Sequence, residues 1–212
     1  YLTIKIPTSD TDNDRRAYSI SSSPFLDEPL AVTVKRVDMG KVSAYLNDNV
    51  KVGDYLEVMP PLGNFTPNVQ PDNTNGYIFY SAGSGITPIF SMIKSILIAE
   101  KNSKLTLFYT SRYIDSIIYK NSLDKLASEY SNRLSIIYSL THYDESWQGH
   151  RGRFNAINLS TLLGKFDSNY VCSAEHFICG PNGLMQQVEE ALLLLDVSPD
   201  KIHKESFASG AN

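Results

Sequence analysis

The pattern of apolar and polar residues changes about one third of the way along the chain. Up to about residue 67, apolar and polar positions alternate in short runs such as "YLTIKI", "LAVTVKRV" and "DYLEVM". Such alternation is typical of half-buried β-strands. The segment "GKVSAYLND", between the second and third runs, has the pattern of a short helix. The first part of the chain is therefore predicted to be β-rich.

From residue 76 onward, strand-like and helix-like segments alternate. The strand-like runs are "GYIFYSA", "KLTLFYTS", "LSIIYSL", "EHFICG" and a short last run, "KIHKESF". Helical patterns occur in "PIFSMIKSILIAEK", over about residues 115–130, and in "LMQQVEEALLLLD". This alternation predicts a five-stranded parallel sheet with helices on both faces. The turn-forming residues of "TPNVQPDNTNG", at 66–76, predict a connection between two domains.

We therefore predict an antiparallel β-barrel domain over residues 1–70, followed by an α/β domain over residues 76–207. The first domain has only about 65 residues, which is short for a closed barrel. We expect one or two opening strands of the barrel to lie outside this sequence. Residues 208–212 are expected to begin a linker to a further domain.

Composition excludes several classes of function. The 212 residues carry a net charge of −4, without the basic excess of a nucleic-acid-binding protein. No run of 18 apolar residues is present, so no membrane-spanning helix is expected. Cys172 and Cys179 are too few for a disulfide scaffold, and the histidines have no metal-binding spacing. We interpret the cysteines as reduced thiols of a cytoplasmic protein.

The loop in "YSAGSGITPIF", at 80–90, lies between a predicted strand and a predicted helix. Gly83 and Gly85 allow a sharp turn and close approach to a ligand. Thr87 suits the N-cap and Pro88 the first helical position, so the helix would direct its free amides at an anion. A pyrophosphate is the natural ligand. The alternative is a plain strand-to-helix turn, since Pro88 replaces the third glycine of the dinucleotide fingerprint.

The end of the next strand favours one pyridine nucleotide. An acid at this position prefers the ribose hydroxyl of NAD, whereas an arginine accommodates the 2′-phosphate of NADP. Here the strand ends in Ser111 and Arg112. We therefore expect NADPH, with NADH as the alternative; Arg112 could also be an ordinary exposed charge.

A third motif, "RRAYSISSSP" at 15–24, lies in the β-rich part. In an extended strand, Arg16 and Tyr18 share one face and Ser19 lies on the other. One short strand could thus hold a phosphate, stack on a flat ring and offer a hydroxyl. The alternative is an ordinary strand with a surface arginine and a packed tyrosine.

Four motifs, R-x-Y-S, G-x-x-S, G-S-G-I-T-P and C-G-P, follow one another in this order along the chain. In this the sequence resembles the ferredoxin–NADP reductase superfamily. Within it, the chain is most similar to reductase components of bacterial oxygenases, of the phenylacetyl-CoA epoxidase reductase type. The resemblance implies a flavoprotein that passes hydride from NAD(P)H to FAD, and then single electrons to an iron–sulfur centre.

The resemblance implies FAD contacts in the first domain. Arg16 would neutralise the FAD pyrophosphate, Tyr18 would stack on the isoalloxazine, and Ser19 would act at flavin N5 as a catalytic residue. The further FAD contacts that it implies are Tyr1, Val34, Lys35, Gly40, Lys41, Val42 and Ser43.

The resemblance also implies roles in the second domain. The nucleotide pyrophosphate would lie on Gly83, Gly85, Ile86, Thr87 and Pro88. Cys179 would lie near nicotinamide C4 as a catalytic residue, in a pocket shaped by Gly180 and Pro181; a small buried apolar residue is the alternative. Catalytic Glu205 and cofactor-binding Phe207 would approach the flavin from the nicotinamide side.

The electron acceptor is the open question. Reductases of this type carry a plant-type [2Fe–2S] domain, whose four cysteines do not occur before Asn212. We expect either a shortened chain whose intact form serves an oxygenase component, or a separate ferredoxin partner. Alternatives are a stand-alone ferredoxin, flavodoxin or flavin reductase, a non-catalytic electron-transfer subunit, and a nucleotide-binding regulatory module.

Overall fold

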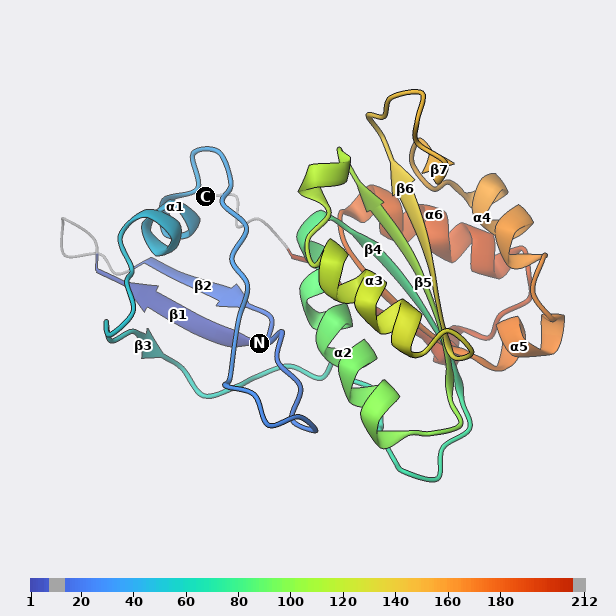
Figure 1. The fold of residues 1–212 in the computed structure, drawn as a ribbon, viewed down its shortest axis with the longest axis horizontal. Helices are drawn as coiled ribbons and strands as arrows, with labels where there is room; N and C mark the ends of the chain where they lie inside the picture. Colours follow the sequence, from blue (N-terminus) through green and yellow to red (C-terminus); the bar gives the residue numbers. More distant parts are fainter. Residues whose placement is uncertain (8–13, 208–212) are drawn as a thin grey trace.

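The computed structural model describes residues 1–7 and 14–207, so the predicted linker at 208–212 lies outside the described residues. The chain forms a small β-rich domain beside a larger α/β domain (Figure 1). None of the described helices is both long enough and apolar enough to cross a membrane.

The first domain contains a three-stranded antiparallel sheet in the order β2-β1-β3. Its strands are β1 (Leu2–Ile6), β2 (Asp14–Tyr18) and β3 (Glu57–Val58), and α1 (Lys41–Asp48) packs beside them. The antiparallel prediction is confirmed, but these strands do not close into a barrel within the described residues. The strand predicted in "LAVTVKRV" is wrong: that segment forms only the isolated bridge between Ile20 and Val32. Much of it is exposed, so alternation there does not reflect a sheet face.

The second domain contains a six-stranded parallel sheet in the order β7-β6-β5-β4-β8-β9. The strands are β4 (Gly76–Ala82), β5 (Lys104–Ser111), β6 (Leu134–Leu140), β7 (His150–Arg151), β8 (Glu175–Cys179) and β9 (Ile202–Glu205). The five predicted strands are all present. The sixth, β7, is a two-residue edge strand that was not predicted, because it is too short for any periodic signal.

Helices cover both faces of this sheet (Figure 1). They are α2 (Ile86–Ala99) and α3 (Lys120–Glu129) on one face, and α4 (Ala156–Leu163), α5 (Ser168–Ser173) and α6 (Asn182–Leu193) on the other. Single 3₁₀ turns lie at Gly83–Gly85, Ile114–Ser116 and Pro199–Lys201. Along β4, Tyr77 and Phe79 join one apolar cluster while Ile78 and Tyr80 join the other. A parallel strand covered on both faces needs this continuous apolar run.

The start of α2 differs from the prediction. Gly85 is the N-cap, because the 3₁₀ turn of the loop leads directly into a helix that begins at Ile86. Thr87 is therefore not the N-cap, and its hydroxyl donates a 2.9 Å hydrogen bond to the Ser84 carbonyl. Pro88 is the third helical residue. It still lies in the first turn, where a missing amide proton costs no helical hydrogen bond.

Polar contacts join the two domains along α2. Lys94 forms an ion pair with Glu28 of the first domain. The Ser23 and Ser95 hydroxyl oxygens lie 2.8 Å apart, and the Ser91 hydroxyl donates a 2.6 Å hydrogen bond to the backbone carbonyl of Ser22. These contacts hold the first domain beside the helix that follows the glycine-rich loop.

Candidate functional site

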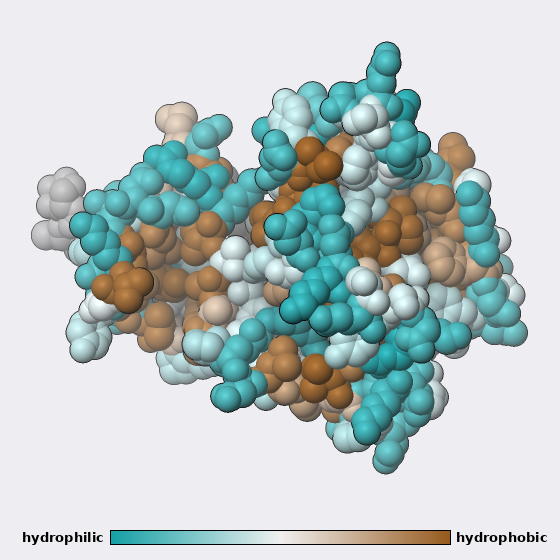
Figure 2. All heavy atoms as spheres, in the orientation of Figure 1, coloured by the Kyte–Doolittle hydropathy of each residue, from teal (hydrophilic) through white to brown (hydrophobic). Residues whose placement is uncertain are grey.

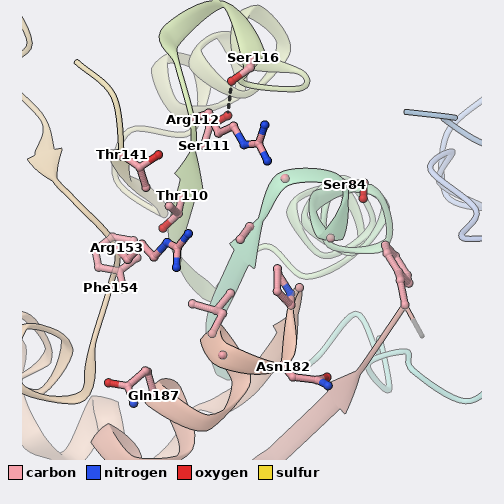
Figure 3. Close-up of a pocket in the computed structure, with 18 of the residues that line it drawn as sticks. Ser84, Thr110, Ser111, Arg112, Ser116, Thr141, Arg153, Phe154, Asn182 and Gln187 are labelled. Carbon is pink, nitrogen blue, oxygen red and sulfur yellow. Dashed lines mark hydrogen bonds between the residues drawn. The ribbon is translucent and has the colours of Figure 1, made fainter. Parts of the chain in front are cut away.

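A cavity of about 1290 Å³ opens at the carboxyl ends of the parallel strands (Figure 3). Its wall combines the loops that follow β4, β5, β6, β7 and β8 with Lys35 of the first domain and Phe207 near the end of the chain. Ligands of open α/β sheets bind at this edge. The cavity is therefore the candidate functional site.

The glycine-rich loop is held by direct backbone contact with the loop after β8. A Cβ atom on Gly85 would lie 2.0 Å from the carbonyl oxygen of Cys179, so no larger residue fits there. Gly83 has a φ of 56°, in the left-handed region that favours glycine. The Tyr109 hydroxyl donates a 3.0 Å hydrogen bond to the Gly83 carbonyl. The loop is thus fixed in shape, with its backbone at the cavity wall.

Hydroxyl groups gather where β5 ends. The oxygens of Ser111 and Ser116 lie 2.8 Å apart, and Ser116 also accepts a 2.9 Å hydrogen bond from the Tyr113 amide (Figure 3). Thr110 lines the cavity, and its buried hydroxyl has no hydrogen-bond partner among the described residues. A buried hydroxyl without a partner is costly.

The charge of the cavity wall has one sign. Lys35, Arg112 and Arg153 line it, and no aspartate or glutamate does among the residues that the structure describes. The whole chain nevertheless has a net charge of −4. Guanidinium groups and helix amides bind phosphate well. The wall therefore suits a ligand with several negative charges.

The loop after β8 forms the opposite wall. Gly180, Pro181 and Asn182 line it, and α6 begins there without a side-chain cap, so its first amides are free. The Ser206 hydroxyl donates a 3.2 Å hydrogen bond to the Asn182 side-chain oxygen. This contact holds the chain next to Phe207 at the cavity.

Several predicted nucleotide contacts lie behind the wall. Ile86, Thr87 and Pro88 are buried in α2, and the Cys179 side chain belongs to the apolar core. Burial raises the pKa of the Cys179 thiol, which therefore stays protonated. Glu205 is half-buried at the end of β9, beside Cys179, and burial raises the pKa of its carboxyl as well. Neither side chain lines the cavity.

The predicted flavin motif lies on β2. Arg16 and Tyr18 oppose Ile4 and Leu2 in the antiparallel ladder, which places both on one face, as predicted. The Arg16 guanidinium is exposed and bonds only to the carbonyl of Arg15, at 2.8 Å. Tyr18 is half-buried, and burial raises the pKa of its hydroxyl. The next residue, Ser19, is buried.

Most of the other predicted FAD contacts lie away from the cavity wall. Ser43 uses its hydroxyl locally, accepting from the Val37 amide at 3.2 Å and donating to the Gly40 carbonyl at 3.1 Å. Val42 is buried in the small core, and Lys41 forms a 2.9 Å ion pair with Asp14. The exposed Tyr1 and the half-buried Val34 lie outside the cavity wall. Of the whole set, Lys35 alone reaches the cavity.

The sequence motifs missed two segments of the wall. Arg153, Phe154 and Asn155 follow β7 and line the cavity, as do Thr141 and His142 after β6. The only sequence signal is the basic run "GHRGR", for which a solvated loop is the favoured interpretation and a place at the edge of the nucleotide is the alternative.

Two known domain families match the two parts of the chain. Residues 1–66 match the family described as Oxidoreductase FAD-binding domain, and residues 79–190 match the family described as Oxidoreductase NAD-binding domain. The chain belongs to the ferredoxin–NADP reductase family. The order of the two matches agrees with the order of the two domains seen here.

Individual relatives agree with this family. The chain is 38% identical to the ferredoxin reductase component of 3-ketosteroid-9-alpha-monooxygenase from Mycobacterium tuberculosis, over 99% of this chain and 54% of the relative. It is 33% identical to one of the subunits of 1,2-phenylacetyl-CoA epoxidase from Escherichia coli, over 98% of this chain and 57% of the relative. The chain thus spans about half the length of these curated relatives.

A solved structure has the same fold. The CS-b5R domains of human Ncb5or, in the NAD⁺ form, superpose with a TM-score of 0.82 at 26% identity. The match covers 98% of this chain and 59% of that one. The arrangement of both domains is therefore that of a known reductase fold.

Proposed function

We propose that this chain is the FAD- and nucleotide-binding part of an NAD(P)H-dependent reductase that serves an oxygenase. The observation that carries the proposal is the acid-free, cationic cavity, which contains Lys35 of the FAD-binding domain beside the glycine-rich loop of the NAD-binding domain. A dinucleotide bound in this cavity would touch both domains. That position suits transfer between two cofactors.

Residues of the chain would bind and position both cofactors. When bound, NAD(P)H supplies a hydride, and FAD accepts it and releases electrons one at a time. The loop of Gly83, Ser84 and Gly85 would hold the nucleotide pyrophosphate, with Lys35 adding a positive charge. On the other side, the exposed Arg16 would bind the FAD pyrophosphate.

Three residues are proposed for the reaction centre. Tyr18 would pack against the isoalloxazine, and Ser19 would offer a hydrogen bond to it. Cys179 would act through its backbone, because its side chain lies in the core while its carbonyl contacts the glycine-rich loop.

We further propose NADPH as the preferred nucleotide. Arg112 is exposed at the cavity wall, and Ser111 lies beside it with its hydroxyl fixed by Ser116. A guanidinium and a hydroxyl suit a ribose 2′-phosphate. Arg112→Ala should raise the KM for NADPH by about tenfold, the loss of one charge-assisted contact. The KM for NADH should change less than twofold; equal effects on both would contradict this role.

The acceptor proposed is a [2Fe–2S] ferredoxin, either as a domain of the same polypeptide or as a separate protein, which in turn serves an oxygenase. The support is that the relatives named above are components of oxygenase systems and are longer than this chain. The unpaired Cys172 and Cys179 are compatible with action in the cytoplasm.

Anaerobic titration tests the reductase proposal. The protein loaded with FAD should lose its flavin absorbance on addition of about one equivalent of NADPH. Reoxidation by a [2Fe–2S] ferredoxin, cytochrome c and free flavin should then be compared, and the ferredoxin should react fastest. A protein that binds no FAD, or whose flavin stays oxidised with both nucleotides, would contradict the proposal. Fastest reaction with free flavin would instead assign a flavin reductase.

A further inference from the structure

Tyr119 joins the second domain to the first through its hydroxyl. It caps the start of α3, and its hydroxyl donates a hydrogen bond to the Thr33 hydroxyl of the first domain. The Thr33 and Ser21 hydroxyl oxygens are 3.2 Å apart, and the Ser21 amide donates a 2.8 Å hydrogen bond to the Ala31 carbonyl. Tyr119 therefore contacts a segment that is anchored within the first domain.

The backbone conformation of Tyr119 is unusual. Its φ of 62° and ψ of 20° lie in the left-handed region, which a bulky residue rarely adopts. Its ring stacks on Phe90 of α2, with the centroids 4.2 Å apart and an angle of 18° between the planes. A strained backbone of this kind persists where the surrounding contacts fix it. The ring is thus held on α2 with its hydroxyl at the first domain.

The residue before Tyr119 is connected to the glycine-rich loop. The Ile118 amide donates a 3.2 Å hydrogen bond to the Tyr109 hydroxyl, which donates its own proton to the Gly83 carbonyl at 3.0 Å. Tyr109 is buried, so these two hydrogen bonds are shielded from water. Two adjacent residues, Ile118 and Tyr119, therefore connect the loop at the cavity with the first domain.

Lys35 lies two residues after Thr33 and reaches the same loop from the first domain. It lines the cavity, and a Cβ atom on Gly83 would lie 3.6 Å from its amine. The amine forms no ion pair with residues 1–7 or 14–207. The four-carbon stem of a lysine is flexible. The place of the amine at the cavity therefore depends on the backbone that carries it, which the contact at Thr33 fixes nearby.

We infer that Tyr119 is a positioning residue, which holds the segment of Lys35 at the glycine-rich loop and so brings the lysine amine to the nucleotide; this inference rests on the proposed function. Tyr119 does not itself line the cavity. Its effect on binding is exerted through Lys35, because a charge that is already in place loses less entropy when the ligand binds. Removal of the tyrosine hydroxyl should therefore matter only while Lys35 is present.

A double-mutant cycle tests this coupling by calorimetry, without any turnover. The FAD-loaded protein is titrated with NADP⁺ and with NAD⁺, and the nucleotide that binds more tightly is used throughout. Lys35→Gln should weaken binding about tenfold, as expected for a charge-assisted contact. Tyr119→Phe keeps the ring on Phe90. It should weaken binding about threefold alone, and less than about 1.5-fold when Lys35→Gln is also present.

Substitutions of Thr33 and Tyr170 provide the controls. Thr33→Val should reproduce the effect of Tyr119→Phe, whereas Thr33→Ser, which keeps the hydroxyl, should retain the wild-type affinity. Tyr170→Phe is the matched control, because the Tyr170 hydroxyl lies 3.1 Å from the Thr106 hydroxyl, within the second domain. Loss of this contact should leave the nucleotide affinity unchanged.

The outcomes separate this inference from the reductase proposal. An unchanged affinity of Tyr119→Phe would overturn the inference, and so would an equal loss with and without Lys35, while flavin reduction by NADPH would still support the reductase. Conversely, coupling of the two residues in a protein whose flavin no nucleotide reduces would support the inference and contradict the reductase. A wild type that binds neither nucleotide would contradict both. Unfolding in urea checks each variant, and if Tyr119→Phe does not fold, Thr33→Val decides by the same criterion.

Discussion

The two domains differ in how firmly they hold their sites. In the second domain, a large apolar cluster lies on each face of the parallel sheet, and the cavity wall is built from loops at its edge. In the first domain, the buried apolar cluster consists of Ile4, Ile6 and Val42, with a few half-buried neighbours. Figure 2 shows apolar surface on this smaller domain, where Val52 and Tyr55 are fully exposed.

The contrast suggests that the cavity of the second domain is more rigid than the predicted flavin site of the first domain. Most of the cavity wall belongs to one well-packed domain, where the backbone of Gly85 lies directly against the Cys179 carbonyl. The predicted flavin residues Arg16 and Tyr18 lie on a thin sheet with a small buried core, so we expect their arrangement to be less firmly fixed. The predictions below test this difference, beginning with the largest expected effect.

Gly85→Ala tests whether the cavity wall of the second domain is rigid. The added Cβ would meet the Cys179 carbonyl at 2.0 Å, and because both groups belong to the backbone, neither can turn away. We expect a loss above about 3 kcal/mol in the free energy of unfolding, at the upper end for overpacking, and loss of nucleotide binding.

Gly83→Ala is the control, because the nearest atom to its added Cβ is the flexible Lys35 amine at 3.6 Å. Its left-handed φ should cost only about 1 kcal/mol. Equal stability of the two variants in urea would contradict a rigid contact between the two loops.

His176 should make the second domain sensitive to acid. It is buried, with its ring nitrogens at 3.1 Å from the Tyr80 hydroxyl and 2.9 Å from the Val171 carbonyl, and burial lowers its pKa to about 4. An unfolded histidine titrates near 6.5, so the unfolded state binds the proton more readily. Its contribution is complete above about pH 6.5 and is lost as the pH falls toward 4, by up to about 3 kcal/mol.

His176→Gln checks this assignment, because glutamine keeps a polar partner for Tyr80 but does not titrate. Unfolding of the variant in urea should depend less on pH between 6.5 and 4 than unfolding of the wild type. The exposed His142 provides the control substitution, His142→Gln, which should leave the wild-type pH profile unchanged. Identical profiles for His176→Gln and the wild type would show that other groups cause the acid sensitivity.

Arg16→Ala tests the predicted flavin site of the first domain. The guanidinium is exposed and bonds only to its neighbour's carbonyl, so its removal should leave the free energy of unfolding without FAD nearly unchanged. Binding of FAD should weaken by about 2 kcal/mol, the value of a charge-assisted hydrogen bond. Flavin fluorescence during dilution measures this change. Arg15→Ala, which removes the exposed preceding arginine of β2, is the matched control and should keep FAD.

The sequence predicted the fold where periodicity extends over long segments. The five predicted strands of the second domain and the helices after β4, β5 and β8 follow from the apolar pattern of their segments. The two wrong strand predictions concern an exposed segment and a very short strand. The alternation at 30–37 occurs in an exposed segment without strand pairing, and β7 has only two residues.

The site was predicted only where a local motif marks it. The loops at Gly83 and Ser111 lie at the cavity because strand ends meet at one edge of a parallel sheet. Arg153 was not predicted, because its place at the cavity depends on the pairing of β7 with β6 rather than on a motif. Cys179 packs in the same apolar cluster as Phe177 on one face of β8, which agrees with the alternative of a small buried apolar residue.

The most direct test of the central claim is single-turnover reduction of the FAD-loaded protein by NADPH deuterated at nicotinamide C4. If the two cofactors meet at this cavity, the flavin absorbance should fall in one phase, and more slowly with deuterium at the transferred position than with hydrogen. A flavin whose absorbance the nucleotide leaves unchanged, in a protein that demonstrably binds both cofactors, would contradict the account.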